Sequence, residues 1–169
     1  MPDTFDVTDA VQLAVVERSG FIESRHAGAA IVLAPDGTVL RSLGATDALV
    51  FPRSSLKPFQ SPASQTAGVT LSGEWAALST ASHSGTDRHV SVVRDMLASV
   101  GLTEDELGCP VAWPGDSATR DEMLLSGGGK SRLRMNCSGK HAAMLMACVA
   151  NDWSTADYLS PTRPLQVHT

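Results

Sequence analysis

The sequence lacks the features of a nucleic-acid-binding, membrane-spanning or secreted protein. Its formal net charge is −5 and no run of lysine and arginine offsets it, whereas binding to phosphates needs a basic face. The longest apolar stretch, residues 142–150, is far shorter than the about 20 residues of a membrane-spanning helix. Residues 1–6 are acidic and lack the apolar core of a signal peptide. We therefore expect no nucleic-acid partner, no membrane partner and a cytoplasmic location.

Cysteine is scarce as well. The chain has three cysteines, Cys109, Cys137 and Cys148. An odd number without a secretory context indicates free thiols or metal ligands rather than a disulfide framework. The remaining composition, 43% hydrophobic and 18% charged, is that of a folded globular protein. A length of 169 residues suffices for one domain with a buried core.

The first third of the chain predicts antiparallel strands joined in a meander. Four segments are apolar and partly β-branched, and short turns such as Pro35-Asp36-Gly37 separate them. The segment 29–33 is apolar throughout, which predicts a buried strand. The expected strands cover residues 11–16, 21–26, 29–33 and 38–40.

From Ser54 onward the pattern predicts helices. The segment 136–149 is apolar on nearly all sides, which is typical of a central buried helix whose polar start lies at an interior cleft. We expect a single domain over residues 1–169, with strands over 1–50 and a mainly helical part over 51–169. The expected helices cover residues 54–66, 73–80, 87–100, 103–106, 117–125, 136–149 and 153–159.

Ser54 and Lys57 form the first candidate for chemistry. They are three residues apart, so on a helix their side chains share one face. A nucleophilic serine needs a base, and a buried lysine that has lost its charge can serve as one. Pro58 is tolerated only in a first turn, so it places the helix start near Ser54 or Ser55. The alternative is an N-capping serine followed by a solvated lysine.

Several motifs in order give the chain a recognisable pattern. They are Ser-x-x-Lys-Pro-Phe-Gln at 54–60, Ala-Ser-His-Ser-Gly at 81–85, Trp-Pro at 113–114 and Asn-Cys-Ser-Gly-Lys-His-Ala at 136–142. Glu-Ser-Arg-His at 23–26 and Pro-Leu-Gln at 164–166 accompany them. In this combination the sequence resembles the Rhizobium etli-type L-asparaginase family over essentially its whole length.

The resemblance implies a fold and a reaction. The fold would be α/β, of the three-layer α+β type seen in serine β-lactamases, penicillin-binding proteins and glutaminases, with Ser-x-x-Lys at a helix start. The reaction would be hydrolysis of the side-chain amide of L-asparagine, a small-molecule substrate, to L-aspartate and ammonia. A homodimer is also what the resemblance implies.

The resemblance carries roles to particular residues. Ser54 matches the nucleophile-type serine and Lys57 its paired lysine. A second serine completes the site, and Ser84 is aligned to it in preference to Ser82; whether it relays protons or binds substrate stays open. The residues expected to bind substrate are Arg53, Ser82 and His83. His83 and His141 can each be metal ligands, substrate contacts or simply hydrogen-bonded structural residues.

The resemblance also implies a zinc ion and a longer protein. Cys137 and Lys140 match positions that hold zinc together with a second cysteine. That cysteine and a second catalytic lysine would lie beyond Thr169, because family members have roughly twice this length. We therefore expect an N-terminal half whose fold is incomplete and which is inactive alone. The alternative for Cys137 and Lys140 is a buried thiol beside a helix-start lysine.

Two rival classes of function remain open. One is another serine amidohydrolase on the same scaffold, such as a glutaminase or a peptidase of cell-wall peptides; the missing secretion signal counts against the peptidase. The other is a non-catalytic module that keeps the motifs without the activity.

Overall fold

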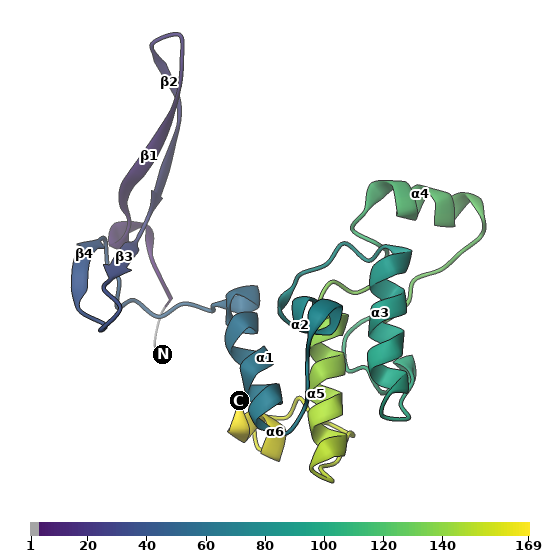
Figure 1. Cartoon of the computed structure of the whole chain (residues 1–169). Coiled ribbons are helices and arrows are strands. Elements are labelled where there is room, and N and C mark those ends of the chain that lie inside the picture. Colours follow the sequence, from purple (N-terminus) through teal and green to yellow (C-terminus); the bar gives the residue numbers. More distant parts are fainter. Residues whose placement is uncertain (1–3) are drawn as a thin grey trace. The chain divides into compact units, whose positions relative to one another are not determined.

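The structure is a computed structural model that describes residues 4–169. The chain divides into two compact units, one ending at Arg53 and one running from Ser54 to Thr169 (Figure 1). The expectation of a single domain stays a prediction. The expectation that no signal peptide is present depends partly on residues 1–3, which lie outside the described residues. Within the described part, no helix is long and apolar enough to cross a membrane.

The first unit consists of two β-hairpins. Strands β1 (Val11–Arg18) and β2 (Phe21–Gly28) pair antiparallel, as do β3 (Ala30–Leu33) and β4 (Val39–Leu43). The first turn works because Ser19 and Gly20 adopt positive φ angles of 50° and 80°, which suit a tight hairpin turn. The four strands are therefore confirmed as elements.

The continuous meander is wrong, because the described strands form two separate two-stranded sheets in which β2 does not pair with β3. The predicted burial of residues 29–33 is wrong as well. Ile31, Val32 and Leu33 are 48%, 50% and 52% exposed. A two-stranded ribbon is a single thin layer, and in residues 4–53 no third strand pairs with β3 or β4.

The second unit is helical. Its elements are η2 (Arg53–Leu56), shared with the end of the first unit, α1 (Lys57–Thr66), α2 (Gly73–Thr80), α3 (Asp87–Ala98), η3 (Glu104–Glu106), α4 (Ser117–Leu125), α5 (Ser138–Ala150) and α6 (Pro164–His168). Helix α5 lies among α1, α2 and α3 (Figure 1) and packs against each of them. The predicted helix over 153–159 is wrong: this segment forms turns, and Asp157 has a φ of 51° that a helix cannot continue through.

The hydrophobic core of the helical unit surrounds α5. Of the eleven residues of α5 from Ser138 to Cys148, ten are buried and Lys140 is not. The prediction of a central buried helix is therefore confirmed. Its partners in the core come from α2, α3, α6 and the loops between the helices: Leu78, Val93, Met96, Leu97, Leu107, Leu133 and Leu165.

Together the fold is a mixed α and β structure with small antiparallel sheets and six α-helices in the described residues. It is consistent with the expected α+β class. The helical unit contains most of the candidate chemistry, because the start of α1, the loop after α2 and the start of α5 all belong to it.

Candidate functional site

Helix α1 begins two to three residues later than the sequence predicts, so Ser54 lies before the helix. Helix α1 begins at Lys57 and has Pro58 in its first turn, while Ser54 belongs to the preceding 3-10 turn η2. Ser54 and Lys57 therefore lie in two successive elements, the 3-10 turn η2 and helix α1. Ser54 is exposed, and no hydrogen bond of its side chain is present in residues 4–169.

Lys57 is the most unusual side chain of the unit. It is only 2% exposed, although lysine is almost never fully buried without a partner. Its Nζ donates to the backbone oxygen of Ala81 at 2.6 Å and to Oγ of Ser82 at 2.8 Å. The alternative of a solvated lysine is therefore wrong. A buried amine that contacts a serine hydroxyl is the geometry that nucleophilic catalysis requires.

The serine that meets Lys57 is Ser82 and not Ser84. Ser84 is exposed, and its backbone oxygen accepts a hydrogen bond from the backbone N–H of Asp116 at 2.9 Å. The sequence alone could not order the two, because both serines stand in the same short loop after α2. The contact brings together Lys57 and a residue that was expected to bind substrate, and leaves Ser84 at the outer end of the loop.

His83 supports this loop from behind. It is 6% exposed, and its Nδ1 accepts from the backbone N–H of Gly85 at 3.1 Å. Its Nε2 lies 2.8 Å from Oγ of Ser138, which itself donates to the backbone oxygen of Leu133 at 2.9 Å. Nε2 must therefore be the donor, and the ring is the neutral Nε2–H tautomer. Both ring nitrogens are occupied, so the ring ties the loop to α5.

The charge of His83 is suppressed. Burial, together with repulsion from the nearby His89 and Lys57, lowers the pKa of His83 to about 4. The two imidazole rings stack with centroids 5.0 Å apart. A protonated His83 would also lose its acceptor for the N–H of Gly85, so the loop geometry depends on the neutral ring.

This arrangement predicts acid sensitivity of folding. The folded-state pKa of His83 is about 4, below its ordinary value of 6.5, so between these values the unfolded chain binds a proton that the folded chain does not. The free energy of unfolding should then fall as the pH falls from 6.5 towards 4, by about 1.4 kcal/mol per pH unit for this histidine. Urea unfolding at a series of pH values measures the slope.

The matched comparison is His83→Gln with His168→Gln as control, since His168 is exposed. The His83 variant should flatten the slope between pH 6.5 and 4 and the His168 variant should not. Equal slopes for the wild-type chain and the His83 variant would contradict a neutral buried ring at this position.

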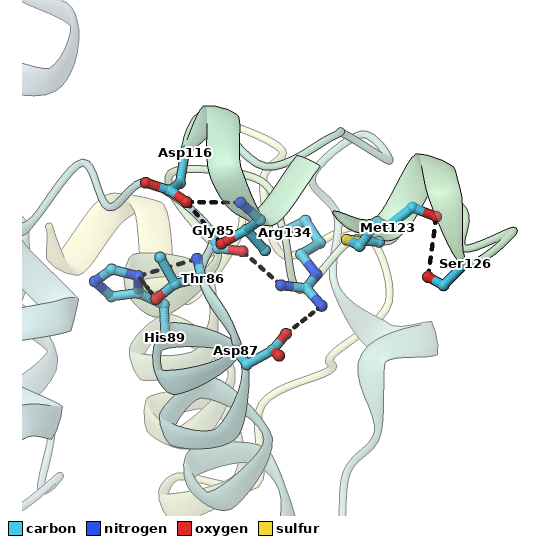
Figure 2. A network of polar contacts seen from close by, with 9 residues as sticks. Gly85, Thr86, Asp87, His89, Asp116, Met123, Ser126 and Arg134 are labelled. Carbon is cyan, nitrogen blue, oxygen red and sulfur yellow. Dashed lines mark hydrogen bonds and ion pairs between the residues drawn. The ribbon is translucent and has the colours of Figure 1, made fainter. Parts of the chain in front are cut away.

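Arg134 fixes the outer end of the loop. Figure 2 shows its guanidinium between Gly85 and the start of α3: one nitrogen donates to the backbone oxygen of Gly85 at 2.7 Å and another pairs with the carboxylate of Asp87 at 2.6 Å. Thr86 and His89 close a capping box at the same point. Asp116, also drawn in Figure 2, caps α4 through its side chain. The loop between Ala81 and Gly85 is therefore held at both ends.

Gly85 is needed at this position for two reasons. Its φ is +75°, and a Cβ added there would lie 2.7 Å from the backbone oxygen of Arg134. Gly85→Ala should lower the free energy of unfolding by about 2 kcal/mol or more, because a positive φ costs about 1 kcal/mol and the clash adds to it. Gly101→Ala is the control, since Gly101 has a φ of +73° and open space around it. Urea unfolding of both variants should show a clearly larger loss for Gly85; equal losses would mean that the clash is relieved freely.

Cys137 and Lys140 lie at the start of α5, one turn apart. Cys137 is the N-cap, and its thiol contacts the side-chain oxygen of Asn136 at 3.2 Å. Burial lowers the pKa of Lys140, while the thiol of Cys137 raises it and Lys57 lowers it again. A lowered pKa favours the uncharged amine that a metal ion would need.

The donor set in the described residues does not fit a zinc site. Zinc in proteins takes four ligands as a rule, and three protein ligands in catalytic sites. No group of three histidine, cysteine, aspartate or glutamate side chains comes together in residues 4–169. Cys109 lies within electrostatic range of Cys137 and Lys140, but burial raises the pKa of its thiol and its Sγ faces the backbone oxygen of Arg132 at 3.5 Å. No chemical step is therefore assigned to a metal.

The surroundings of Lys57 are basic. The strongest charge effects on His83 and His141 come from Lys57, Lys140 and His89 rather than from carboxylates. Burial, with both lysines, lowers the pKa of His141 to about 4. Basic side chains around a site favour a substrate that carries a carboxylate. Arg53 belongs to the other unit, so the structure does not place it relative to this site.

Two polar residues of the site were missed by the sequence reasoning. Ser138 is fully buried and receives the ring of His83; its position inside the Asn-Cys-Ser-Gly-Lys motif was an available signal. Tyr158 is 2% exposed and contacts Nδ1 of His141 at 2.6 Å. It is the single tyrosine of the chain, but nothing in the sequence links it to a residue 17 positions earlier.

Comparison with known proteins adds the family. A search of curated proteins found no match to this chain. The family model described as L-asparaginase II matches residues 14–169, which include Ser54, Lys57, the loop 81–85 and the start of α5. Such a family implies an asparaginase-type amidohydrolase with a small-molecule substrate. The chain belongs to the L-asparaginase II family.

Proposed function

We propose that the protein to which this chain belongs hydrolyses L-asparagine to L-aspartate and ammonia, with Lys57 as the general base. The observation that carries the proposal is the contact of the buried Lys57 Nζ with Oγ of Ser82, 2.8 Å away, beside the Ser-x-x-Lys motif. Family membership supports the reaction class. The proposal follows the expectation for Ser54 and Lys57 and exchanges Ser84 for Ser82.

The chemistry proceeds in two halves. Lys57 in its neutral form accepts the proton of Ser54, and Oγ of Ser54 attacks the carboxamide carbon. The tetrahedral intermediate collapses to an aspartyl ester as the proton passes from Lys57 to the departing amine, which leaves as ammonia. Water then gives a proton to Lys57 and attacks the ester, and Lys57 returns the proton to Oγ of Ser54 as the ester bond breaks and L-aspartate leaves. Backbone N–H groups near the start of α1 would hold the oxyanion.

Ser82 takes the relay position in this scheme. It is hydrogen-bonded to Lys57, so it can pass a proton between the amine and the leaving group. Ser54 has no such bond in the structure, and catalytic hydrogen bonds often close only when substrate binds. Ser54 stands three residues before Lys57, in the 3-10 turn that leads into α1. The reverse assignment, with Ser82 as nucleophile, is distinguished from this one by which serine carries the aspartyl ester during turnover.

The basic surroundings of Lys57 favour an amino-acid amide as substrate. The α-carboxylate of L-asparagine supplies the negative charge that Lys140 and its neighbours can attract. Ammonia release from L-asparagine and from L-glutamine tests the choice, with the 169-residue chain and with the whole product of its reading frame. Faster release from asparagine supports the proposal. Preference for glutamine indicates the glutaminase, and no release from either protein indicates the non-catalytic module.

Further properties are proposed from the resemblance alone. The complete fold would be like that of serine β-lactamases, the protein would be a cytoplasmic homodimer, and a zinc ion would need ligands in addition to Cys137 and Lys140. Metal analysis of the purified protein, with Cys137→Ser as comparison, tests the zinc ion: stoichiometric zinc that the variant loses supports it, and a metal-free wild type contradicts it.

A further inference from the structure

Tyr158 and His141 form a second buried polar pair beside the catalytic loop. The hydroxyl of Tyr158 accepts a hydrogen bond from the backbone N–H of Gly108 at 2.9 Å and lies 2.6 Å from Nδ1 of His141. The rings meet edge to face, with centroids 5.9 Å apart. The hydroxyl oxygen of Tyr158 already accepts from Gly108, and residues 4–169 offer its proton no acceptor other than Nδ1 of His141, so the hydroxyl donates and Nδ1 accepts.

The other ring nitrogen of His141 is therefore a donor. A neutral imidazole whose Nδ1 accepts carries its proton on Nε2. Every buried side-chain nitrogen or oxygen in residues 4–169 has a hydrogen-bond partner, and no protein partner of this Nε2 is present there. His141 is 7% exposed, so the small exposed part of its ring includes Nε2. The ring thus presents one N–H group at the surface of the helical unit.

Hydrogen bonds and one helical turn connect this pair to Lys57. Lys57 contacts Ser82, the neighbouring His83 contacts Ser138, and His141 follows Ser138 by one turn of α5. Lys57 also lies near enough to act electrostatically on His141. His141 and the amine that the proposed reaction uses are therefore both linked to residues at the start of α5.

We propose that Tyr158 is a positioning residue which holds His141 in the Nε2–H tautomer, so that His141 donates a hydrogen bond to a carboxylate or carboxamide oxygen of the substrate. The inference rests on the proposed function. It assigns the binding contact to His141, which has a free N–H, and not to His83, whose two nitrogens are occupied.

Gly108 makes the close approach of Tyr158 achievable. A Cβ added to Gly108 would lie 3.1 Å from the hydroxyl oxygen of Tyr158 and 2.9 Å from Cδ1 of Leu159. Any side chain at position 108 would therefore press on the hydroxyl and its hydrogen bond. Gly108 has no positive φ, so an alanine there acts through this contact and not through backbone strain.

The first test is spectroscopic and needs no activity. Proton–nitrogen correlation spectra of the chain with ¹⁵N-labelled histidine report which ring nitrogen of each of the five histidines carries the proton. His141 should be the Nε2–H tautomer with a hydrogen-bonded Nδ1. In Tyr158→Phe its Nδ1 signal should move to that of an acceptor without a partner. An Nδ1–H tautomer in the wild type, or an unchanged Nδ1 signal in the variant, would overturn the inference.

Two further variants keep this test decisive. Gly108→Ala should move the Nδ1 signal in the same direction and applies if Tyr158→Phe does not fold. Ser64→Ala is the matched control, because it also removes a buried hydroxyl from the helical unit; within residues 4–169 this hydroxyl bonds only to the backbone oxygen of Gln60. The control should leave the signals of His141 in place.

The second test concerns binding. Tyr158→Phe should raise KM for L-asparagine by about tenfold and leave kcat nearly unchanged. The Kd for L-aspartate, followed at the His141 Nε2–H signal, should rise by about the same factor. The reason is that the variant weakens one hydrogen bond that is made equally in the ground and transition states. Unchanged KM and Kd in Tyr158→Phe would overturn the inference. The proposed function would still be supported if Lys57→Met loses activity. If no protein releases ammonia but L-aspartate moves the Nε2–H signal, the proposed function fails and the contact of His141 stands.

Discussion

Replacement of Lys57 by methionine should lower kcat/KM for L-asparagine at least about a thousandfold, the range expected when a general base is removed together with the activation of its nucleophile. Methionine has nearly the length of the lysine stem, so it fills the buried position that Lys57 occupies at 2% exposure. It offers no group that can accept or return a proton. Ammonia release under saturating and limiting substrate measures the loss.

The fold of this variant should survive. Methionine leaves the backbone oxygen of Ala81 and the hydroxyl of Ser82 without their donor, which costs about 1–3 kcal/mol. Circular dichroism and urea unfolding check that the loss of activity is not a loss of structure. Lys130→Met is the matched control, because Lys130 is an exposed loop lysine whose replacement should leave activity intact. Retained activity in the folded Lys57 variant would remove Lys57 from the mechanism.

The largest expected effect on stability is at Gly139. This residue lies in the first turn of α5, where a Cβ would approach the backbone oxygen of Leu78 to 2.5 Å and Cβ of Leu78 to 2.9 Å. These atoms belong to α2 and cannot rotate away, so Gly139→Ala must push the two helices apart. We expect a loss of about 3 kcal/mol of unfolding free energy, at the upper end for overpacking of a core.

The control for this variant is Gly129→Ala. Gly129 has no atom within 4 Å of a built Cβ and no positive φ, so alanine there should be neutral or slightly stabilising. The displacement of α5 should also move Ser138 away from His83, because their 2.8 Å contact starts from the same turn. Equal stability of the two glycine variants would show that α2 and α5 separate without cost.

The local elements could be predicted from the sequence because their signals are local. Alternation and turns placed the strands, and the apolar run 136–149 gave the central α5. The tertiary arrangement could not be predicted in the same way. Pairing of β2 with β3 would need a register that no local pattern specifies, and the turn at Asp157 depends on a single φ of 51°. Burial of β3 was overestimated because apolar composition does not say whether a covering layer exists.

The candidate site was predicted in part. The Ser-x-x-Lys motif led to Lys57, whose burial and partners the structure provides. Ser82 and Ser84 could not be ordered from sequence, because the difference is which hydroxyl reaches an amine 25 residues away. Tyr158 could not be found at all, since its role depends on a contact across the fold. Catalysis by Ser54, Ser82 or Ser84, the zinc ion, the dimer and the cytoplasmic location stay predictions.

The central claim is that a serine activated by Lys57 becomes esterified by the substrate and that this serine is Ser54. Acid quenching during turnover of L-asparagine, followed by peptide mass spectrometry, locates the aspartyl ester. The account predicts an ester on Ser54 that is absent from Ser54→Ala and Lys57→Met and still forms in Ser82→Ala, more slowly. An ester on Ser82 in the wild-type protein, or full turnover by Ser54→Ala, would contradict it.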